Sequence, residues 1–194
     1  MKKIHQSVVV ISIAALAASL LLIASPSRGQ VSANADEKEK ALRAKRIAEQ
    51  FEAQARVLTV FDRQGKVLKT VGERGLYDDP VFSPDRTRLA VIKGDLESET
   101  EDLWVLEIAA GNGTRITSNK NRRQEGLRPG PVWSPDGRQI AYVALRGGYW
   151  SLCRKASSGE GTEEVLYQYP GRPTVTDWSM DGRLDPSRVL WKLP

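Results

Sequence analysis

The fold of this chain is decided by one stretch of sequence, Val132-Trp133-Ser134-Pro135-Asp136-Gly137. Two other stretches align with it without gaps, Val81-Phe82-Ser83-Pro84-Asp85-Arg86 and Asp177-Trp178-Ser179-Met180-Asp181-Gly182. Ser-Pro-Asp-Gly suits a type I turn, because Pro presets φ at the second position and Gly is favoured at the fourth. Each stretch therefore predicts a turn that joins two antiparallel strands.

Short β-rich runs flank the three turns and alternate with Gly, Pro, Asp and Ser, which is typical of an all-β fold. The aromatic residues of the three stretches lie 51 and 45 residues apart, within the range of repeat periods that indicate propeller blades. The five tryptophans fall on first or third strands, where we expect packing between blades rather than ligand stacking. The predicted strands are Val57–Phe61, Lys66–Val71, Val81–Ser83, Arg88–Ile92, Leu103–Ile108, Thr114–Thr117, Val132–Ser134, Gln139–Ala144, Tyr149–Arg154, Glu164–Tyr169, Val175–Ser179 and Arg188–Leu193.

The strings FSPDRTRLAV, WSPDGRQIAY and DWSMDGR resemble the TolB-like (WD-repeat-like) β-propeller repeats of exported bacterial proteins, and LWVLEI, YWSLCRKA and LWKLP resemble their third strands. The resemblance covers residues 57–194. It implies four-stranded blades around a central channel and a role as a binding platform. Such repeats also occur as sensor or substrate-filter modules beside kinase or prolyl-oligopeptidase domains.

The strand count predicts about three blades, fewer than the four that close a ring. The third repeat departs from the pattern, because Leu184-Asp185-Pro186-Ser187 stands where its second strand should be and Pro is disfavoured inside strands. The propeller therefore reads as incomplete and truncated. Either a second copy completes it, or a helix caps one end, or the chain is the remnant of a longer gene.

Residues 1–29 have the layout of a signal peptide, with Lys2 and Lys3 ahead of the apolar run Val8–Ala24. We expect cleavage before Gln30 and a periplasmic or secreted protein, while an uncleaved inner-membrane anchor stays open. Residues 30–56 follow as a linker and a charged amphipathic helix. One apolar stripe runs along this predicted helix, and it either covers an edge of the domain or binds a partner. Its residues are Ala44, Ile47, Ala48, Phe51, Ala55 and Leu58.

Composition excludes several chemistries. The single histidine, His5, lies in the predicted signal, so Ser-His-Asp and Cys-His catalysis lack their base, and one cysteine, Cys153, leaves no zinc-finger or haem pattern. Removing residues 1–29 also lowers the net charge of +5 by three, which weakens a nucleic-acid interpretation. We therefore predict no catalytic, cofactor-binding or metal residues and no cofactor.

Several polar side chains are candidates for a catalytic or metal site. Asp78 and Asp79 are adjacent, so in an extended segment they point apart and cannot flank one glycosidic bond. The acidic stretch Asp95–Asp102 lacks the ligand pattern of a calcium loop. A buried, inert thiol is expected for Cys153. The basic residues of the connection Ser118–Gly130 are expected to form a solvated loop: Lys120, Arg122, Arg123 and Arg128. The repeated aspartates are expected to be turn residues: Asp85, Asp136 and Asp181.

The sequence thus predicts an exported, non-enzymatic β-propeller scaffold that binds a protein or peptide of the cell envelope. The alternatives are a substrate-gating propeller remnant of a prolyl-oligopeptidase-type peptidase, or a membrane-anchored sensor. Contact with a membrane is expected only if the signal is uncleaved. A homo-oligomer that completes the propeller is also open.

Overall fold

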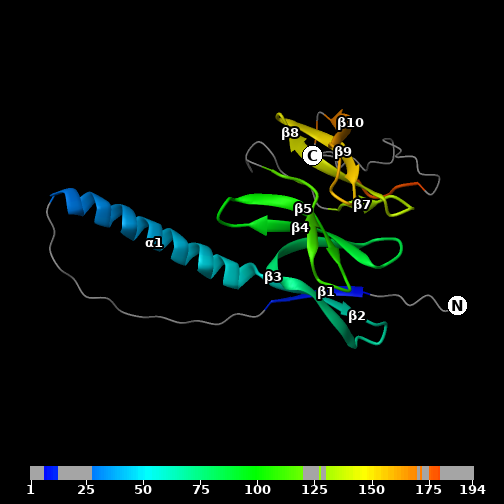
Figure 1. The fold of residues 1–194 in the computed structure, drawn as a ribbon, viewed down its shortest axis with the longest axis horizontal. Helices are drawn as coiled ribbons and strands as arrows, with labels where there is room; N and C mark the ends of the chain where they lie inside the picture. The colour runs from blue at the N-terminus through cyan, green and yellow to red at the C-terminus, as the bar shows by residue number, and fades with distance from the viewer. Residues whose placement is uncertain are drawn as a thin grey trace.

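A computed structural model describes residues 7–12, 28–119, 127, 130–169, 171 and 175–179, with side chains from residue 36 onward. It consists of two antiparallel sheets and one long helix (Figure 1). The strand order is β1-β2-β3-β4-β5-β6 in the first sheet and β10-β9-β8-β7 in the second. The elements are β1 Ser7–Ser12, α1 Arg28–Gln54, β2 Arg56–Phe61, β3 Val67–Phe82, β4 Arg88–Asp95, β5 Thr100–Glu107, β6 Gly113–Arg115, β7 Val132–Trp133, β8 Gln139–Arg146, β9 Tyr149–Ala156 and β10 Glu164–Tyr169.

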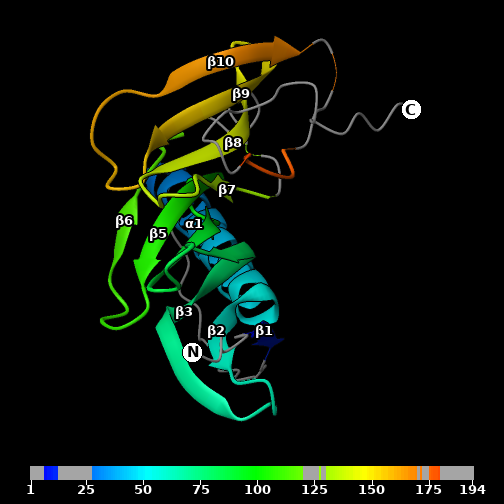
Figure 2. The same ribbon diagram turned by 90° about the vertical axis from the view of Figure 1, so that its right-hand side faces the viewer.

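Two four-stranded blades account for most of the described strands. The end of β3 with β4, β5 and β6 forms one blade, and β7 to β10 form the next; Figure 2 shows the second above the first. Their strands pair in sequence order, as in propeller blades. The predicted all-β, partial β-propeller is confirmed. Of the predicted third blade, Arg188–Leu193 lies outside the described residues, and Val175–Ser179 forms no strand, which corrects that prediction.

Strand β3 is longer than the sequence predicted. Lys66–Val71 and Val81–Ser83 were expected as separate strands, but β3 runs through both, pairing with β2 at its start and with β4 at its end. Positive φ angles at Gly72 (71°) and Asp79 (49°) and a register shift between Asp78 and Val81 interrupt its regular pairing. A single strand can therefore serve two sheets, because such irregularities bend it.

The two described turns have the same hydrogen bonds. The Ser134 amide donates to the Gln139 carbonyl at 2.9 Å, and the Ser134 hydroxyl donates to Asp136 at 2.6 Å. Ser83 makes the same bonds to Arg88 and Asp85 at 2.9 and 2.6 Å. Asp85 and Asp136 are thus turn residues, whereas Asp181 lies outside the described residues.

The fourth turn position differs between the two repeats, with Gly137 at φ 71° and Arg86 at φ 61°. A side chain at positive φ is strained, whereas glycine is not. We expect Arg86→Gly to raise the free energy of unfolding by about 0.5–1 kcal/mol. Glycine removes the strain of positive φ, but it also makes the unfolded chain more flexible, and this second effect cancels part of the gain. Urea unfolding checks this, and Gly137→Ala should have the opposite sign. Equal stability of Arg86→Gly and the parent would contradict the prediction.

The core lies between the two blades. It joins buried residues of β4 and β5 to those of β8 and β9, and Trp133 is part of it. Trp133 and Trp178 are 6% and 5% exposed, while Trp104 and Trp150 are half-buried. Packing between blades is thus confirmed for Trp133. The buried members of the core are Ala90, Ile92, Leu103, Val105, Ile116, Leu127, Trp133, Ile140, Tyr142, Ala144 and Cys153.

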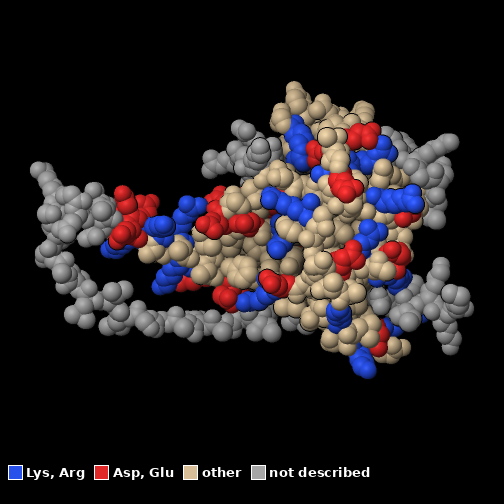
Figure 3. Space-filling view, viewed as in Figure 1, with Lys and Arg blue, Asp and Glu red and all other residues tan. Residues whose placement is uncertain are grey.

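Helix α1 projects from the blades as an arm (Figure 1). Its charged residues of both signs alternate along the exposed surface (Figure 3). The helix contacts the blades at two places: Arg74 binds Glu52 at 2.5 Å near its end, and Arg43 donates to the Glu97 carbonyl of the β4–β5 hairpin at 3.4 Å. The stripe is shorter than predicted: Ala55 follows the end of the helix, and Leu58 belongs to β2 and lies in the sheet core.

Part of the predicted signal segment appears as strand β1, which pairs with β2 from Ser7 opposite Phe61 to Ser12 opposite Arg56. The sequence did not predict this strand; its consecutive β-branched residues Val8 to Ile11 favour extended structure. Within the described residues, no helix combines the length and apolar character that crossing a bilayer requires.

Candidate functional site

The two adjacent aspartates, Asp78 and Asp79, have different surroundings in the fold. Asp78 accepts a hydrogen bond from Arg56 at 2.9 Å, and burial, with a contribution from the charge of Asp78, raises the pKa of Asp79. Asp85 sits in its turn, where the Ser83 hydroxyl and the Thr87 amide lower the pKa of its carboxyl to about 2. Asp78 therefore connects β3 to β2, and Asp85 stabilises its turn.

The acidic stretch Asp95–Asp102 forms the tip of the β4–β5 hairpin. Asp95 accepts hydrogen bonds from the Glu97 and Ser98 amides at 2.8 and 2.9 Å, which lower the pKa of its carboxyl. Asp102 lies in β5 opposite Lys93, is 4% exposed and accepts a hydrogen bond from the Thr117 hydroxyl at 2.8 Å. Across the described ranges, no three His, Cys, Asp or Glu side chains gather into a metal site.

The remaining candidates are the basic residues of the connection Ser118–Gly130 and the thiol of Cys153. Lys120, Arg122, Arg123 and Arg128 lie outside the described residues. Cys153 is fully buried, and desolvation, together with the nearby charge of Glu163, raises the pKa of its thiol to about 12. The predicted buried thiol is confirmed, and at neutral pH it is protonated and a poor nucleophile.

A set of polar side chains that the sequence did not single out joins the two blades. We call it the interblade polar cluster: Asn119, Tyr142, Arg146 and Glu163. Glu163 accepts hydrogen bonds from the Tyr142 hydroxyl at 2.6 Å and from Nε and Nη2 of Arg146 at 2.7 Å each. Nη1 of Arg146 donates to Oδ1 of Asn119 at 3.2 Å. Because Asn119 follows β6 and the other three residues belong to the second blade, Arg146 bridges the blades.

These contacts determine the protonation states of Glu163 and Tyr142. Burial opposes ionisation of Glu163, but the hydrogen bonds from Arg146 and Tyr142 outweigh it and hold the pKa of the carboxyl below its usual value. Desolvation, reinforced by Glu163, raises the pKa of Tyr142. Glu163 is therefore an anion with its oxygens occupied, and Tyr142 is a neutral donor, so neither acts as a base at neutral pH.

The cluster lies beside two adjoining hollows, which we call the polar cleft. One has a volume of about 590 Å³ and the other about 210 Å³, and they share Ser118 and Asn119. The larger is lined by Lys93, Gly94, Asp95, Ser98, Thr100, Asp102, Trp104, Arg115, Ser118 and Asn119. The smaller is lined by Ile116, Thr117, Ser118, Asn119, Arg146, Lys155 and Glu163.

The polar cleft offers both hydrogen-bond donors and acceptors beside one aromatic ring. Lys93 lies with its ammonium 4.9 Å from the centre of the Trp104 ring, a cation–π distance. Arg115 pairs with Asp102 on the same wall. Such a mixture suits recognition of a peptide, whose backbone also carries donors and acceptors.

The sequence could not have located this cleft. Glu163 and Arg146 are 17 residues apart, and Arg146 and Asn119 are 27 apart, without a recognisable spacing pattern. They come from three segments distant in sequence, namely the end of β8, the residue before β10 and the segment after β6, which their hydrogen bonds join. The only available signal was the longer than usual connection after β6, which contains Asn119.

No family model matches the chain. Two curated relatives match part of it. The uncharacterized peptidase YuxL of Bacillus subtilis (strain 168) is 31% identical over 108 residues, which cover 54% of this chain and 16% of YuxL. Dipeptidyl-peptidase 5 of Trichophyton equinum is 28% identical over 86 residues, 37% of this chain and 12% of that protein. The match thus spans less than a fifth of either relative.

Solved structures show the fold. TolB from Acinetobacter baumannii has a TM-score of 0.51 and 22% identity, over 66% of this chain and 30% of that chain. The putative TolB from Agrobacterium tumefaciens has a TM-score of 0.50 and 21% identity, over 69% of this chain and 49% of that chain. The chain has a partial TolB-like β-propeller fold, as the sequence predicted.

The names of the curated relatives correct one expectation. The sequence predicted a non-enzymatic protein because it lacks a histidine beyond His5. Both kinds of curated relative are named peptidases, which contradicts that prediction. The physical reason for the error is that a propeller segment carries its own strand and turn pattern whether or not it belongs to an enzyme.

Proposed function

We propose that the blades are a protein- or peptide-binding propeller module of a peptidase-type protein, and that the polar cleft is where the peptide binds. The propeller scaffold and the peptidase names of its partial relatives support the class. The observation that carries the site is the polar cleft: its larger hollow has charged side chains of both signs, the Asn119 amide and the Trp104 ring, and its smaller hollow is lined by residues of both blades. A propeller can present such a cleft to an extended chain without forming a covalent bond to it.

The geometry suits binding of a substrate more than its cleavage. Glu163 is held by Arg146 and Tyr142, and the Cys153 thiol is protonated, so the described cleft supplies contacts but no activated nucleophile. In a peptidase, such a module would select or guide the peptide toward a nucleophile and base elsewhere.

The compartment is also part of this proposal. Lys2, Lys3 and the apolar run Val8–Ala24 support export, which places the module in the periplasm or outside the cell. An amino-terminal sequence beginning at Gln30 or Asp36 is expected for the exported protein, and one beginning at Met1 would contradict it. Such cleavage would also remove β1, so the mature first sheet would begin at β2. Completion of the propeller by a second copy stays a prediction that sedimentation can measure.

Filling the polar cleft should abolish peptide binding. Ser118 is exposed and lines both hollows, so Ser118→Trp places an indole where the peptide would lie. We expect at least a tenfold weaker affinity, measured by fluorescence anisotropy with fluorescein-labelled ten-residue peptides of randomised sequence. A tenfold loss corresponds to about 1.4 kcal/mol.

The matched control is Ser158→Trp, because Ser158 is also exposed but lines neither hollow of the polar cleft. It should bind peptides as the parent does, and both variants should unfold at the same urea concentration as the parent. Undetectable binding by the parent, or equal binding by both variants, would rule out the polar cleft as the site.

A further inference from the structure

A second hollow lies on the other side of the β4–β5 hairpin, between that hairpin and helix α1. Its volume is about 520 Å³, and we call it the helix groove. Its helical wall is the exposed part of the apolar stripe, and its opposite wall is the end of the hairpin. The groove is lined by Ala44, Ile47, Ala48, Phe51, Glu52, Leu76, Gly94, Asp95, Leu96 and Glu97.

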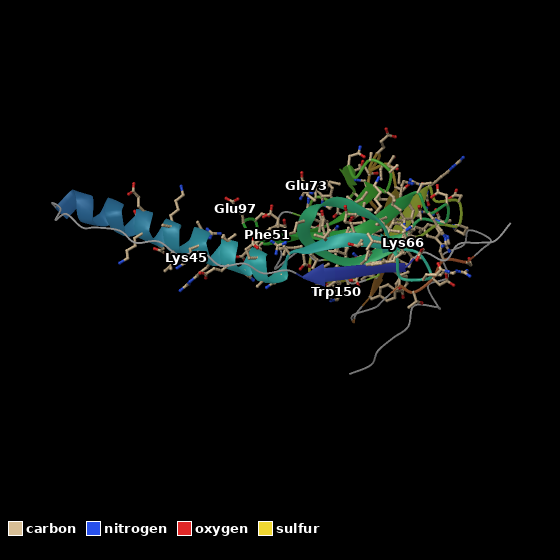
Figure 4. The ribbon with its side chains drawn as sticks, turned by 90° about the horizontal axis from the view of Figure 1, so that it is seen from below. Lys45, Phe51, Lys66, Glu73, Glu97 and Trp150 are labelled. Atoms are coloured by element: carbon tan, nitrogen blue, oxygen red, sulfur yellow. The ribbon has the colours of Figure 1, made fainter. Side chains whose placement is uncertain are left out.

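The helix groove is held open by contacts at its ends. At the base of the helix, Arg74 donates to the Glu52 carboxylate at 2.5 Å and to its carbonyl at 2.9 Å. Further out, Nη2 of Arg43 donates to the Glu97 carbonyl at 3.4 Å. Figure 4 shows Phe51 and Glu97 close together where the helix leaves the blades, with Lys45 farther along the helix. The two walls therefore belong to one arrangement rather than to independent segments.

The apolar surface of this groove is not covered by the described blades. Ala44 and Ala48 are exposed and Ile47 and Phe51 only half-buried, although all four lie on one side of the helix. An apolar stripe along one face of a surface helix normally marks the face that packs against another part of the protein or against a partner. The hairpin reaches the helix at Arg43, which donates to the Glu97 carbonyl, but Ala44 and Ala48 between these contacts stay exposed, so this part of the stripe remains available to another molecule.

The charged side chains that line the groove are acidic: Glu52, Asp95 and Glu97, with no lysine or arginine among the lining residues. Arg74 pairs with Glu52 at the base of the helix, so the carboxylates of Asp95 and Glu97 supply the acidity at the hairpin wall. The chain as a whole carries a net charge of +5, so a cationic molecule has no general attraction to it and would respond to the local acidity. Apolar walls with an acidic rim complement a segment that has apolar side chains on one side and basic ones beside them.

We infer that the helix groove docks a basic amphipathic helix of a partner protein. The apolar face of that helix packs against Ile47, Phe51 and Leu96, and its lysine or arginine side chains reach Glu97 and Asp95. Recognition of this kind, in which an amphipathic helix lies in an apolar groove, uses anchors one turn apart. The groove is small, so the expected affinity is in the micromolar range, about that of weak transient interfaces.

This site goes beyond the proposed peptide-binding function. The helix groove and the polar cleft share only Gly94 and Asp95 at the hairpin. Ser118 lines the polar cleft alone, and Ala48 lines the helix groove alone. Failure of one site can therefore be told apart from failure of the other.

The test uses the full chain and two synthetic peptides of fourteen residues. One is the amphipathic leucine–lysine peptide LKKLLKLLKKLLKL, and the other has every lysine replaced by glutamate. We expect the lysine peptide to bind, with a Kd that rises with salt, and the glutamate peptide not to bind. Because charge attraction is screened, the loss between low and high salt identifies the acidic rim as its source.

Two variants locate the binding. Ala48→Trp fills the groove and should raise the Kd of the lysine peptide at least tenfold, and Glu97→Lys should raise it several-fold. Ala53→Trp is the matched control, because Ala53 is exposed on the opposite side of the same helix and should leave binding unchanged. Circular dichroism of all variants should match that of the parent.

Three results would overturn the inference: no binding of the lysine peptide, equal binding of the glutamate peptide, or equal effects of Ala48→Trp and Ala53→Trp. If Ala48→Trp alters the dichroism spectrum, Glu97→Lys decides instead, since Glu97 is an exposed tip residue. Binding of the lysine peptide that Glu97→Lys does not weaken would then reject the groove.

Discussion

Replacing Trp133 by alanine is expected to lower the free energy of unfolding by about 3–5 kcal/mol, the usual cost of removing a buried aromatic side chain. Trp133 is 6% exposed and lies in the core between the blades. Its Nε1 donates to the Val81 carbonyl of the preceding blade at 3.1 Å, and the Arg88 guanidinium lies 4.9 Å from the ring centre. One side chain thus joins both blades, and its loss takes a large part of the stability typical of a domain.

Urea unfolding followed by circular dichroism measures this effect. Trp133→Phe keeps most of the apolar contact but loses the hydrogen bond to Val81, so it should cost about 1 kcal/mol. Trp104→Ala is the matched control, because Trp104 is also a blade tryptophan but only half-buried. A loss at Trp104 as large as that at Trp133 would contradict the view that Trp133 is the tryptophan that holds the blades together.

The blades themselves were predictable from local chemistry. Ser134 and Asp136 act within a few residues of each other, so the turn and its two strands follow from the letters alone. The repetition of that turn at Ser83 predicted the second described blade in the same way. Even the positive φ at Arg86 could be anticipated, because a glycine occupies the matching position in the other repeats.

The sequence did not indicate features that depend on distant partners. Whether Lys66–Val71 and Val81–Ser83 are one strand or two depends on the positive φ of Asp79 and on pairing with β4. The position of α1 depends on the contact of Arg74 with Glu52, which no periodicity reveals. The interblade polar cluster forms only when the blades stack, so no local pattern points to it.

The expected result for Arg146→Met follows from the cluster that stacking creates. Arg146 supplies two of the hydrogen bonds that Glu163 accepts, and both side chains are largely buried, at 21% and 23% exposure. Removing one partner leaves the other charge without compensation in the interblade core, which is the costly way to break a buried pair. We expect the free energy of unfolding to fall by about 3 kcal/mol at pH 7, toward the lower end of values for buried pairs because some solvent reaches both groups.

Two companion variants separate charge from packing. Lys155→Met removes a cation from the same cleft, where its Nζ donates only to the Ile116 carbonyl at 2.9 Å, and should cost about 1 kcal/mol. Arg146→Met combined with Glu163→Leu removes both charges and should recover much of the loss, since an apolar pair no longer strands a carboxylate. If the double variant is as unstable as Arg146→Met, packing rather than the stranded charge is the cause.

The pH dependence of the same variant tests the sign of the interaction. In the parent, the pKa of folded Glu163 lies below its usual value, so its contribution to stability is complete above the unfolded pKa of about 4.3 and is lost as the pH falls through the folded pKa. Arg146→Met removes the donors that lower this pKa, and protonation of Glu163 then relieves the stranded charge. The difference in unfolding free energy between parent and variant should therefore be largest near pH 7 and shrink as the pH falls from the folded pKa of Glu163 in the variant, which burial raises, to the lower folded pKa in the parent. A difference that stays constant down to pH 3 would show that Arg146 stabilises the blades by its contacts alone and not through the Glu163 charge.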